Sequence, residues 1–413
     1  MKFILIRLSN IGLRGTTLVS KFFLIFLLAR YLEPSELGLY GLLTVTISYV
    51  LFLLGLDFYV YANREVLKAD VAVRGRLLKS EAALWGGLYT AILPLTLFLF
   101  VFELLPWKLL PWFLCLLVLE HITQELNRLL VILSRQLVAS WILFFRAGAW
   151  CLVVIALMGA EPEYRTLETV MTAWVLGAFV ALGIGFVVIV RSGIGGWKLP
   201  IDWAWVRKGI RIALPMLVAT LALRAFYTVD RYWFEELVGL DVLGAYVLFI
   251  GMCNALLSFM DAGVFTFFNP ALISANANQD AKVFREKFRQ MLIQTVGLVI
   301  GFSLVAWYVV DPLLRWLDRP LYLEYQYLFG WLLLGNALFV MSMVPHYGLY
   351  ARGHDKPLVI SHLVGLVVFV ATTALITPHT SDLAVPFGLI SGFGFILFWK
   401  TLQFYRLTPP NWR

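Results

Sequence analysis

The chain has 413 residues, of which 61% are hydrophobic and only 14% are charged, and its formal net charge is +8. Soluble domains carry about 25% charged residues, so this composition excludes an ordinary soluble protein. Apolar runs of about 20 residues recur along the whole chain, and each is long enough to cross a bilayer core of about 30 Å. We therefore predict an all-α, multi-pass membrane protein. The net positive charge is typical of cytoplasmic loops, and no nucleic-acid partner is expected.

The apolar runs predict twelve transmembrane helices. The first run continues to Ala29 with no small-residue cleavage site, so we interpret it as a first span and not as a removed signal peptide. The predicted spans are residues 9–30, 37–57, 80–102, 111–133, 139–159, 169–190, 209–231, 243–266, 290–310, 325–350, 358–377 and 383–404.

The charges between the spans predict the orientation. Most of the lysines and arginines outside the spans, including Lys400 at the end of the last one, lie in the even-numbered loops and the termini. Lys and Arg accumulate on the cytoplasmic side, so we expect both termini in the cytoplasm. One such loop carries Phe284 and Phe288 among four basic residues at 282–289, a pattern typical of a short amphipathic helix on the inner surface.

A short motif recurs after half a chain length. Leu37-Gly38-Leu39-Tyr40 returns as Leu243-Gly244-Ala245-Tyr246. We predict two pseudo-symmetric six-helix bundles, residues 1–191 and 207–413, joined by a cytoplasmic linker at 192–206 that is flexible at its glycine-rich start. Six spans return the chain to its starting side, so the halves should have parallel orientation, as in several membrane carriers.

Ionisable residues inside spans are costly, and they usually face a bundle interior or a water-filled cavity. In the first span Arg7, Arg14 and Lys21 are spaced by seven, which places them on nearly one helix face. They predict a cationic stripe along a cavity. The alternative is that Arg7 and Arg14 extend to the inner headgroups.

The fourth span has one polar face, formed by Glu120, Gln124, Asn127 and Arg128. Glu125 lies beside this face and can pair with Arg128 at i+3. This pattern favours either a cavity wall with a protonatable carboxylate or an ion-pair network that locks helix packing.

Other span charges need partners from elsewhere. Arg146 and Arg224 have no acidic residue within one turn on their own helices, so each requires a group from another helix or a bound anion. Asp57 and Asp261 occupy corresponding regions of the two halves and are either proton sites or helix-capping residues. A gate or structural pair near the outer interface is predicted for Asp230, Arg231 and Arg30.

The predicted interior is net positive, which suits a phosphate or carboxylate group. The candidate substrate contacts are Arg14, Lys21, Arg128, Arg146 and Arg224. The candidates for ion or proton coupling are Glu120, Glu125, Asp261 and Asp57. We expect no metal, cofactor or catalytic group, because the sequence has no Cys/His cluster and no phosphate-binding P-loop. The histidines His346, His354, His362 and His379 are assigned no role.

The motifs resemble those of a known family. Leu27–Leu32 with Glu36–Tyr40, and Ala213–Pro215 with Val229–Tyr232 and Leu243–Tyr246, resemble the starts of the two halves of Wzx-type polysaccharide flippases. These flippases belong to the MOP (multidrug/oligosaccharidyl-lipid/polysaccharide) exporter superfamily. Asp230 and Arg231 match the family pattern by position. The recognisable motifs are confined to the first two spans of each half.

The resemblance implies a function and its partners. It implies a flippase in the bacterial cytoplasmic (inner) membrane that moves undecaprenyl-diphosphate-linked oligosaccharide to the periplasmic leaflet by ion- or proton-coupled alternating access. Its expected partners are that lipid, membrane lipids, and the polymerase and chain-length regulator of the same O-antigen or capsule pathway. The alternatives are a MATE-like small-molecule antiporter and an integral membrane polysaccharide polymerase, against which the short outer loops argue.

Overall fold

The computed structural model describes residues 2–412, with side chains from Leu8 onwards, so Arg7 lies outside the described side chains. The described residues are helical or irregular and contain no strand. Twelve helices are long and apolar enough to cross a membrane. The predicted fold class, an all-α protein with twelve transmembrane helices, is confirmed.

The chain divides into two compact units. The first unit contains Met1–Leu32 and Leu39–Leu221, and the second contains Glu33–Gly38 and Ala222–Arg413. Two long helices therefore contribute to both: α2 (Pro34–Gly55), through its first turn, and α10 (Trp203–Val238).

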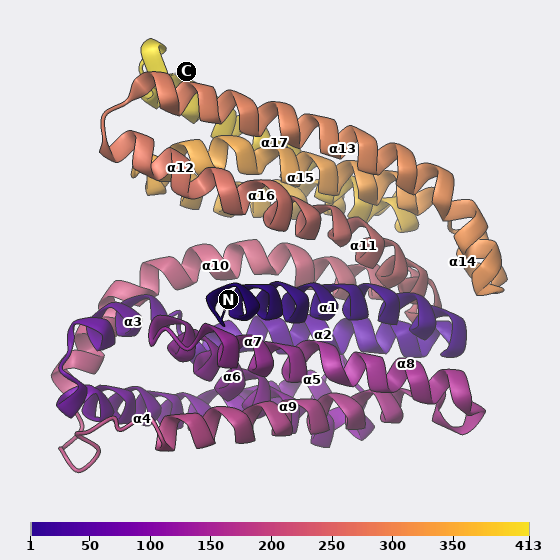
Figure 1. Ribbon diagram of the computed structural model, residues 1–413. Coiled ribbons are helices and arrows are strands. Elements are labelled where there is room, and N and C mark those ends of the chain that lie inside the picture. Colours follow the sequence, from indigo (N-terminus) through magenta and orange to yellow (C-terminus); the bar gives the residue numbers. More distant parts are fainter. Residues whose placement is uncertain (1, 413) are drawn as a thin grey trace. The chain divides into compact units, whose positions relative to one another are not determined.

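The first unit holds the indigo to magenta helices of Figure 1. Besides parts of α2 and α10, its elements are α1 (Lys2–Tyr31), α3 (Tyr59–Lys68), α4 (Val71–Thr96), α5 (Phe98–Val101), η1 (Trp107–Leu109), α6 (Leu110–Ile132), α7 (Gln136–Phe144), η2 (Phe145–Ala149), α8 (Trp150–Ala160), η3 (Pro162–Tyr164) and α9 (Leu167–Val190). Local signals set some of these boundaries. The Asp70 carboxylate caps α4 at the backbone N–H of Ala72, and the Thr166 hydroxyl caps α9 at the N–H of Thr169.

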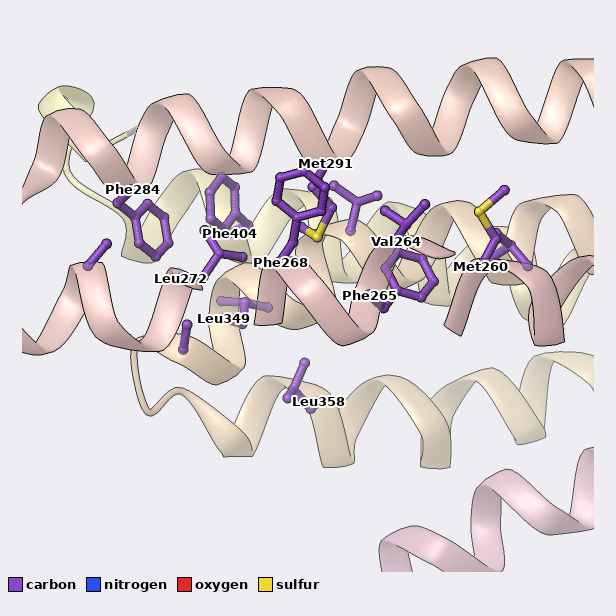
Figure 2. Close-up of a cluster of buried hydrophobic side chains, with 14 of the residues drawn as sticks. Met260, Val264, Phe265, Phe268, Leu272, Phe284, Met291, Leu349, Leu358 and Phe404 are labelled. Atoms are coloured by element: carbon purple, nitrogen blue, oxygen red, sulfur yellow. The ribbon is translucent and has the colours of Figure 1, made fainter. Parts of the chain in front are cut away.

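The second unit holds the later helices. Besides parts of α2 and α10, its elements are α11 (Leu240–Met260), η4 (Asp261–Phe265), α12 (Thr266–Ala277), α13 (Ala281–Leu317), α14 (Pro320–Glu324), α15 (Tyr327–Ala351), α16 (Asp355–Ile376), α17 (Ser381–Leu407) and η5 (Pro410–Trp412). In this unit α17 packs along both α15 and α16. A buried cluster, shown in part in Figure 2, joins α11, α12, α13, α15, α16 and α17.

Two spans are interrupted by a turn of π-helix. The first interruption, η2, lies between α7 and α8, and the second, η4, lies between α11 and α12. Each contains a charged residue that the sequence singles out, Arg146 in η2 and Asp261 in η4. A π-turn adds a residue to the helix and is frequent at functional sites.

The glycines of the repeated motif meet in the second unit. A Cβ at Gly38 would collide with the carbonyl of Leu240, and a Cβ at Gly244 would collide with backbone atoms of Pro34. The first turns of α2 and α11 therefore touch backbone to backbone. Small residues are the usual means of such close packing in membranes, where van der Waals contact replaces the hydrophobic effect as the source of helix association.

The structure differs from the expected elements in two places. The predicted short amphipathic helix at 284–288 is the beginning of the long helix α13. The glycine-rich start of the linker is tied to α4, because the N–H of Gly75 donates to the carbonyl of Gly195 at 2.7 Å. Arg76 also pairs with Asp202 at 3.1 Å. Residues in the first turns of α4 thus hold the linker in place within the first unit.

Candidate functional site: a polar cavity in the first unit

The first unit contains a partly open cavity of about 350 Å³. Its walls come from α1, α2, α6, η2, α8 and α9. The residues that line it are Lys21, Leu24, Ile25, Tyr40, Thr44, Ile47, Ser48, Leu51, Glu120, Gln124, Arg146, Ala147, Trp150 and Trp174. Lys21, Glu120 and Arg146, three of the charged residues predicted from the sequence, therefore share one site.

The π-turn η2 positions Arg146. Glycine allows this turn to approach its neighbours, since a Cβ at Gly148 would meet Thr17 of α1 at 2.9 Å, and one at Gly177 of α9 would meet the carbonyl of Phe145 at 2.6 Å. The indole N–H of Trp150 donates to the carbonyl of Arg146 at 2.9 Å. This packing orients the Arg146 side chain towards α6.

Arg146 has an acidic partner on α6. A group from another helix or a bound anion was expected, because the helix of Arg146 has no acidic residue within one turn. The Nε of Arg146 lies 3.1 Å from Oε2 of Glu120, and its Nη2 donates to Oε1 of Gln124 at 3.5 Å. Oε1 of Glu120 accepts the indole N–H of Trp174 at 2.8 Å. Glu120 is only 6% exposed, so its carboxylate depends on these protein partners and not on solvent.

Lys21 leaves the cavity with a positive excess. Arg146 and Glu120 neutralise one another, and Lys21 is the further cation among the lining residues. The other wall is aromatic: the rings of Trp150 and Trp174 stack with centroids 5.5 Å apart, and Tyr40 of the repeated motif also lines the cavity. A cationic group beside flat apolar rings can hold an anionic group that is attached to a sugar or another ring.

A second polar network lies nearer the C-terminal end of α6. Arg128 donates to the Glu125 carboxylate, which confirms the predicted i, i+3 pair, and its guanidinium lies 3.6 Å from the ring centroid of Tyr59. Asp57 interacts electrostatically with Glu125. Glu81 of α4 interacts with both Glu125 and Arg128. Arg128 and Glu125 thus belong to a buried ion-pair network and are not among the residues that line the cavity.

This second network includes three carboxyl groups, those of Asp57, Glu81 and Glu125, and one guanidinium, that of Arg128, and all three carboxyl groups are less than 10% exposed. His121 lies alongside, with its Nδ1 2.7 Å from the hydroxyl of Tyr89 and its Nε2 buried without a hydrogen-bond partner. Buried carboxylates in excess of cations are unfavourable unless a proton or cation accompanies them.

Arg14 lies apart from both networks. Its side chain is exposed, and its Nε donates to the hydroxyl of Ser140 on α7 at 3.4 Å. It is not among the residues that line the cavity.

The remaining predicted residues lie at the end of the first span or in the second unit. Arg30 lies in the last turn of α1. In the second unit Arg224 is exposed on α10, and Asp261 is exposed in η4.

Asp230 belongs to a buried hydrogen-bond network. Its carboxylate accepts the hydroxyl of Tyr246 at 2.7 Å and the backbone N–H of Arg231 at 2.8 Å. Arg231 donates through Nη1 to the carbonyl of Tyr227 at 3.1 Å. The two repeat tyrosines thus have different surroundings, because Tyr40 lines the cavity of the first unit and Tyr246 is fully buried in the second.

Sequence reasoning missed several of these groups. Glu81 has a recognisable signal, since it is an acidic residue at the start of a predicted span. Trp150 and Trp174 have none, because cavity aromatics look like interfacial aromatics in a sequence. A further polar group for which the sequence predicted no role, Lys400 with His346 and His362, lies in the second unit. Lys400 is fully buried with no hydrogen-bond partner for its amine, and it acts electrostatically on both imidazoles.

Comparison with known proteins identifies the fold. No protein-family model and no curated protein matches the sequence. Among solved structures, an inward-facing multidrug resistance MATE family transporter of the MOP superfamily is 13% identical, with a TM-score of 0.74 over 94% of this chain and 95% of its own. An outward-facing MATE family transporter of that superfamily is 14% identical, with a TM-score of 0.51 over 98% and 92%.

A further neighbour bears on pocket chemistry. It is a MOP superfamily transporter from Pyrococcus furiosus, described as having a binding pocket of reverse polarity that suggests a different function. It is 14% identical, with a TM-score of 0.52 over 98% of this chain and 93% of its own. The chain is therefore a multi-pass membrane protein. Its fold is that of the MATE transporters of the MOP superfamily.

Proposed function

We propose that this protein is a transporter for an anionic amphiphile, and that its substrate is an undecaprenyl-diphosphate-linked oligosaccharide moved from the cytoplasmic to the periplasmic leaflet by alternating access. The observation that carries the proposal is the cavity of the first unit, where Lys21 adds an unbalanced positive charge beside the stacked rings of Trp150 and Trp174. The diphosphate matches the charge, and the sugars match the aromatic wall.

The two polar networks of α6 suggest how substrate and ion could be linked. Glu120 pairs with Arg146 inside the cavity, whereas Glu125 lies in the network with Asp57 and Glu81. Arg146 also acts electrostatically on Glu125, so a change of charge in the cavity changes the electrostatic potential at the second network. We propose that a proton or monovalent cation binds at the second network and that an anion in the cavity changes its affinity there.

The competing function is export of small organic cations, as the multidrug resistance descriptions of the neighbours suggest. A cation exporter would need an excess of negative charge in its cavity, and this cavity has the opposite excess. The Pyrococcus furiosus transporter, whose reverse pocket polarity is described as suggesting a different function, supports the use of pocket polarity to distinguish functions on this fold.

The test uses purified full-length protein in liposomes and two probes. The first probe is a fluorescent polyprenyl-diphosphate-linked sugar whose movement between leaflets is followed by chemical quenching, and the second is the cationic dye ethidium. Lys21→Gln should slow lipid movement by about 10- to 100-fold, because one charge-assisted contact is worth about 1.5–3 kcal/mol. Lys21→Glu should reduce it further.

The matched control is Arg191→Gln, which removes an exposed cation at the end of α9, away from the cavity-lining residues. It should behave as wild type. Movement of ethidium without movement of the lipid-linked sugar would reject the proposed substrate class. Equal lipid rates in wild type, Lys21→Gln and Lys21→Glu would reject the cavity as its binding site.

A further inference from the structure

The start of α13 carries a second hollow, independent of the cavity in the first unit. It has a volume of about 460 Å³ and lies on the surface of the second unit. Its lining residues are Lys282, Arg285, Glu286, Phe288, Arg289, Leu292 and Tyr405. All of them except Tyr405 of α17 belong to the first turns of α13.

The basic residues of this hollow share one helix face. Lys282, Arg285 and Arg289 are spaced at i, i+3 and i+7, so their side chains rise on the same side of α13. All three are exposed. Glu286, the acidic residue of the lining, accepts a hydrogen bond from Gln290 at 3.0 Å. No ion pair to Arg285 or Arg289 occurs among the described side chains, so both guanidinium groups can receive an anion.

Aromatic residues of the same turns anchor the helix in the protein. The ring of Phe288 stacks on Phe404 with centroids 4.4 Å apart, and Phe284 packs edge-on against Trp412 at 5.4 Å. Figure 2 shows Phe284 and Phe404 within the buried cluster of this unit. These contacts hold the beginning of α13 in place and so fix the direction of its basic face.

The surface changes from basic to apolar along α13. Beyond Arg289 the helix presents exposed apolar residues, with Leu292 36% and Ile293 59% exposed, and it continues as a candidate membrane span to Leu317. From this change we expect the hollow to lie where the helix passes from the hydrocarbon core to the headgroups. Paired arginines bind phosphate oxygens well because the guanidinium fork matches their geometry.

We propose that this hollow binds the phosphate of an anionic phospholipid, with Arg285 and Arg289 as its main ligands and Lys282 at its edge. The acyl chains lie along Leu292 and Ile293. Clusters of basic residues beside a membrane span attract anionic lipids by about 1 kcal/mol per residue. The inferred site does not depend on what the protein transports.

The test is a lipid titration of the purified full-length protein in a neutral detergent. Phosphatidylglycerol and phosphatidylcholine with the same acyl chains are added separately, and the thermal unfolding midpoint is read from tryptophan fluorescence. Wild type should be stabilised by phosphatidylglycerol at lower concentrations than by phosphatidylcholine. In the double variant R285Q/R289Q the half-maximal phosphatidylglycerol concentration should rise by roughly 10- to 30-fold, while R285K/R289K should recover part of the affinity.

The matched control is R207Q/R211Q, which removes two exposed arginines at i, i+4 near the start of α10. It changes net charge equally and should leave the lipid response unaltered. If this control lost affinity for phosphatidylglycerol to the same extent, the effect would be one of general surface charge, and the proposed site would be wrong. Full stabilisation by inorganic phosphate alone, without lipid, would overturn the assignment to a phospholipid. An unshifted lipid response in R285Q/R289Q would also overturn it.

Discussion

Buried charge partners are the least predictable feature at the scale of single residues. The pair Glu125–Arg128 follows from spacing on one helix, because i and i+3 side chains are neighbours in any α-helix. The pair Arg146–Glu120 joins two helices and depends on η2. From the sequence only the need for a partner could be stated. Its identity required the packing of α9 against both α6 and η2.

Lys400 is a second residue whose surroundings could not be predicted from the sequence. By position it is an interfacial lysine at the end of the last span, where a long side chain normally reaches the headgroups. In the structure it is instead completely buried where α17 packs against α15 and α16, and it interacts electrostatically with His346 and His362. Its amine has no hydrogen-bond partner among the described residues. Burying an amine in this way is unfavourable.

Replacing Lys400 by methionine should therefore stabilise the protein. The variant keeps the length of the side chain and removes the unsatisfied amine, so the free energy of unfolding should rise by about 1–3 kcal/mol. The measurement is the thermal unfolding midpoint in detergent. Lys356→Met, on the exposed side of α16, is the control and should change stability by less than about 0.5 kcal/mol. A lower midpoint in Lys400→Met would mean that the amine makes a stabilising interaction.

At the scale of helices, hydropathy predicted the twelve spans, because length and apolar composition are what the bilayer requires of a helix. The π-turns η2 and η4 were not predictable, since one extra residue in a helix leaves no pattern in an apolar sequence. The length of α13 was also missed. Its amphipathic first turns suggested a separate surface helix, and the structure continues them without a break into the ninth span.

The repeated glycines are the best test of packing between helices. A methyl group at Gly244 has no room, because the backbone of Pro34 occupies its place. Gly244→Ala should therefore lower the free energy of unfolding by roughly 1–3 kcal/mol. Gly297→Ala, at an open position inside α13, is the matched control and should be neutral or stabilising by up to about 1 kcal/mol. Equal midpoints in the two variants would show that the α2–α11 contact does not determine stability.

At the scale of the whole molecule, the fold was predictable for two physical reasons. The composition excluded an ordinary soluble protein and indicated a membrane protein, and the repeated motif indicated two related halves. The comparisons place the chain on the MATE fold at 13–14% identity, where few individual residues are shared. Substrate class does not follow from such a fold, because function depends on the groups that line its sites. That is why the charge of the first-unit cavity carries the proposal.

The orientation of the chain in the membrane is a further prediction for the whole molecule. The excess of Lys and Arg in the even-numbered loops predicts that both termini face the cytoplasm. Alkaline phosphatase needs disulfide bonds and so becomes active only outside the cytoplasm, whereas green fluorescent protein folds in the cytoplasm. A fluorescent protein fused after Arg413 should therefore be bright, and phosphatase inserted after Glu163, in the loop between α8 and α9, should be active. The reverse pattern would invert the topology. It would also place the basic hollow of α13 on the outer face. The titration in detergent would still report binding of anionic lipid there, but in the cell the lipid would have to come from the outer leaflet and not from the cytoplasmic one.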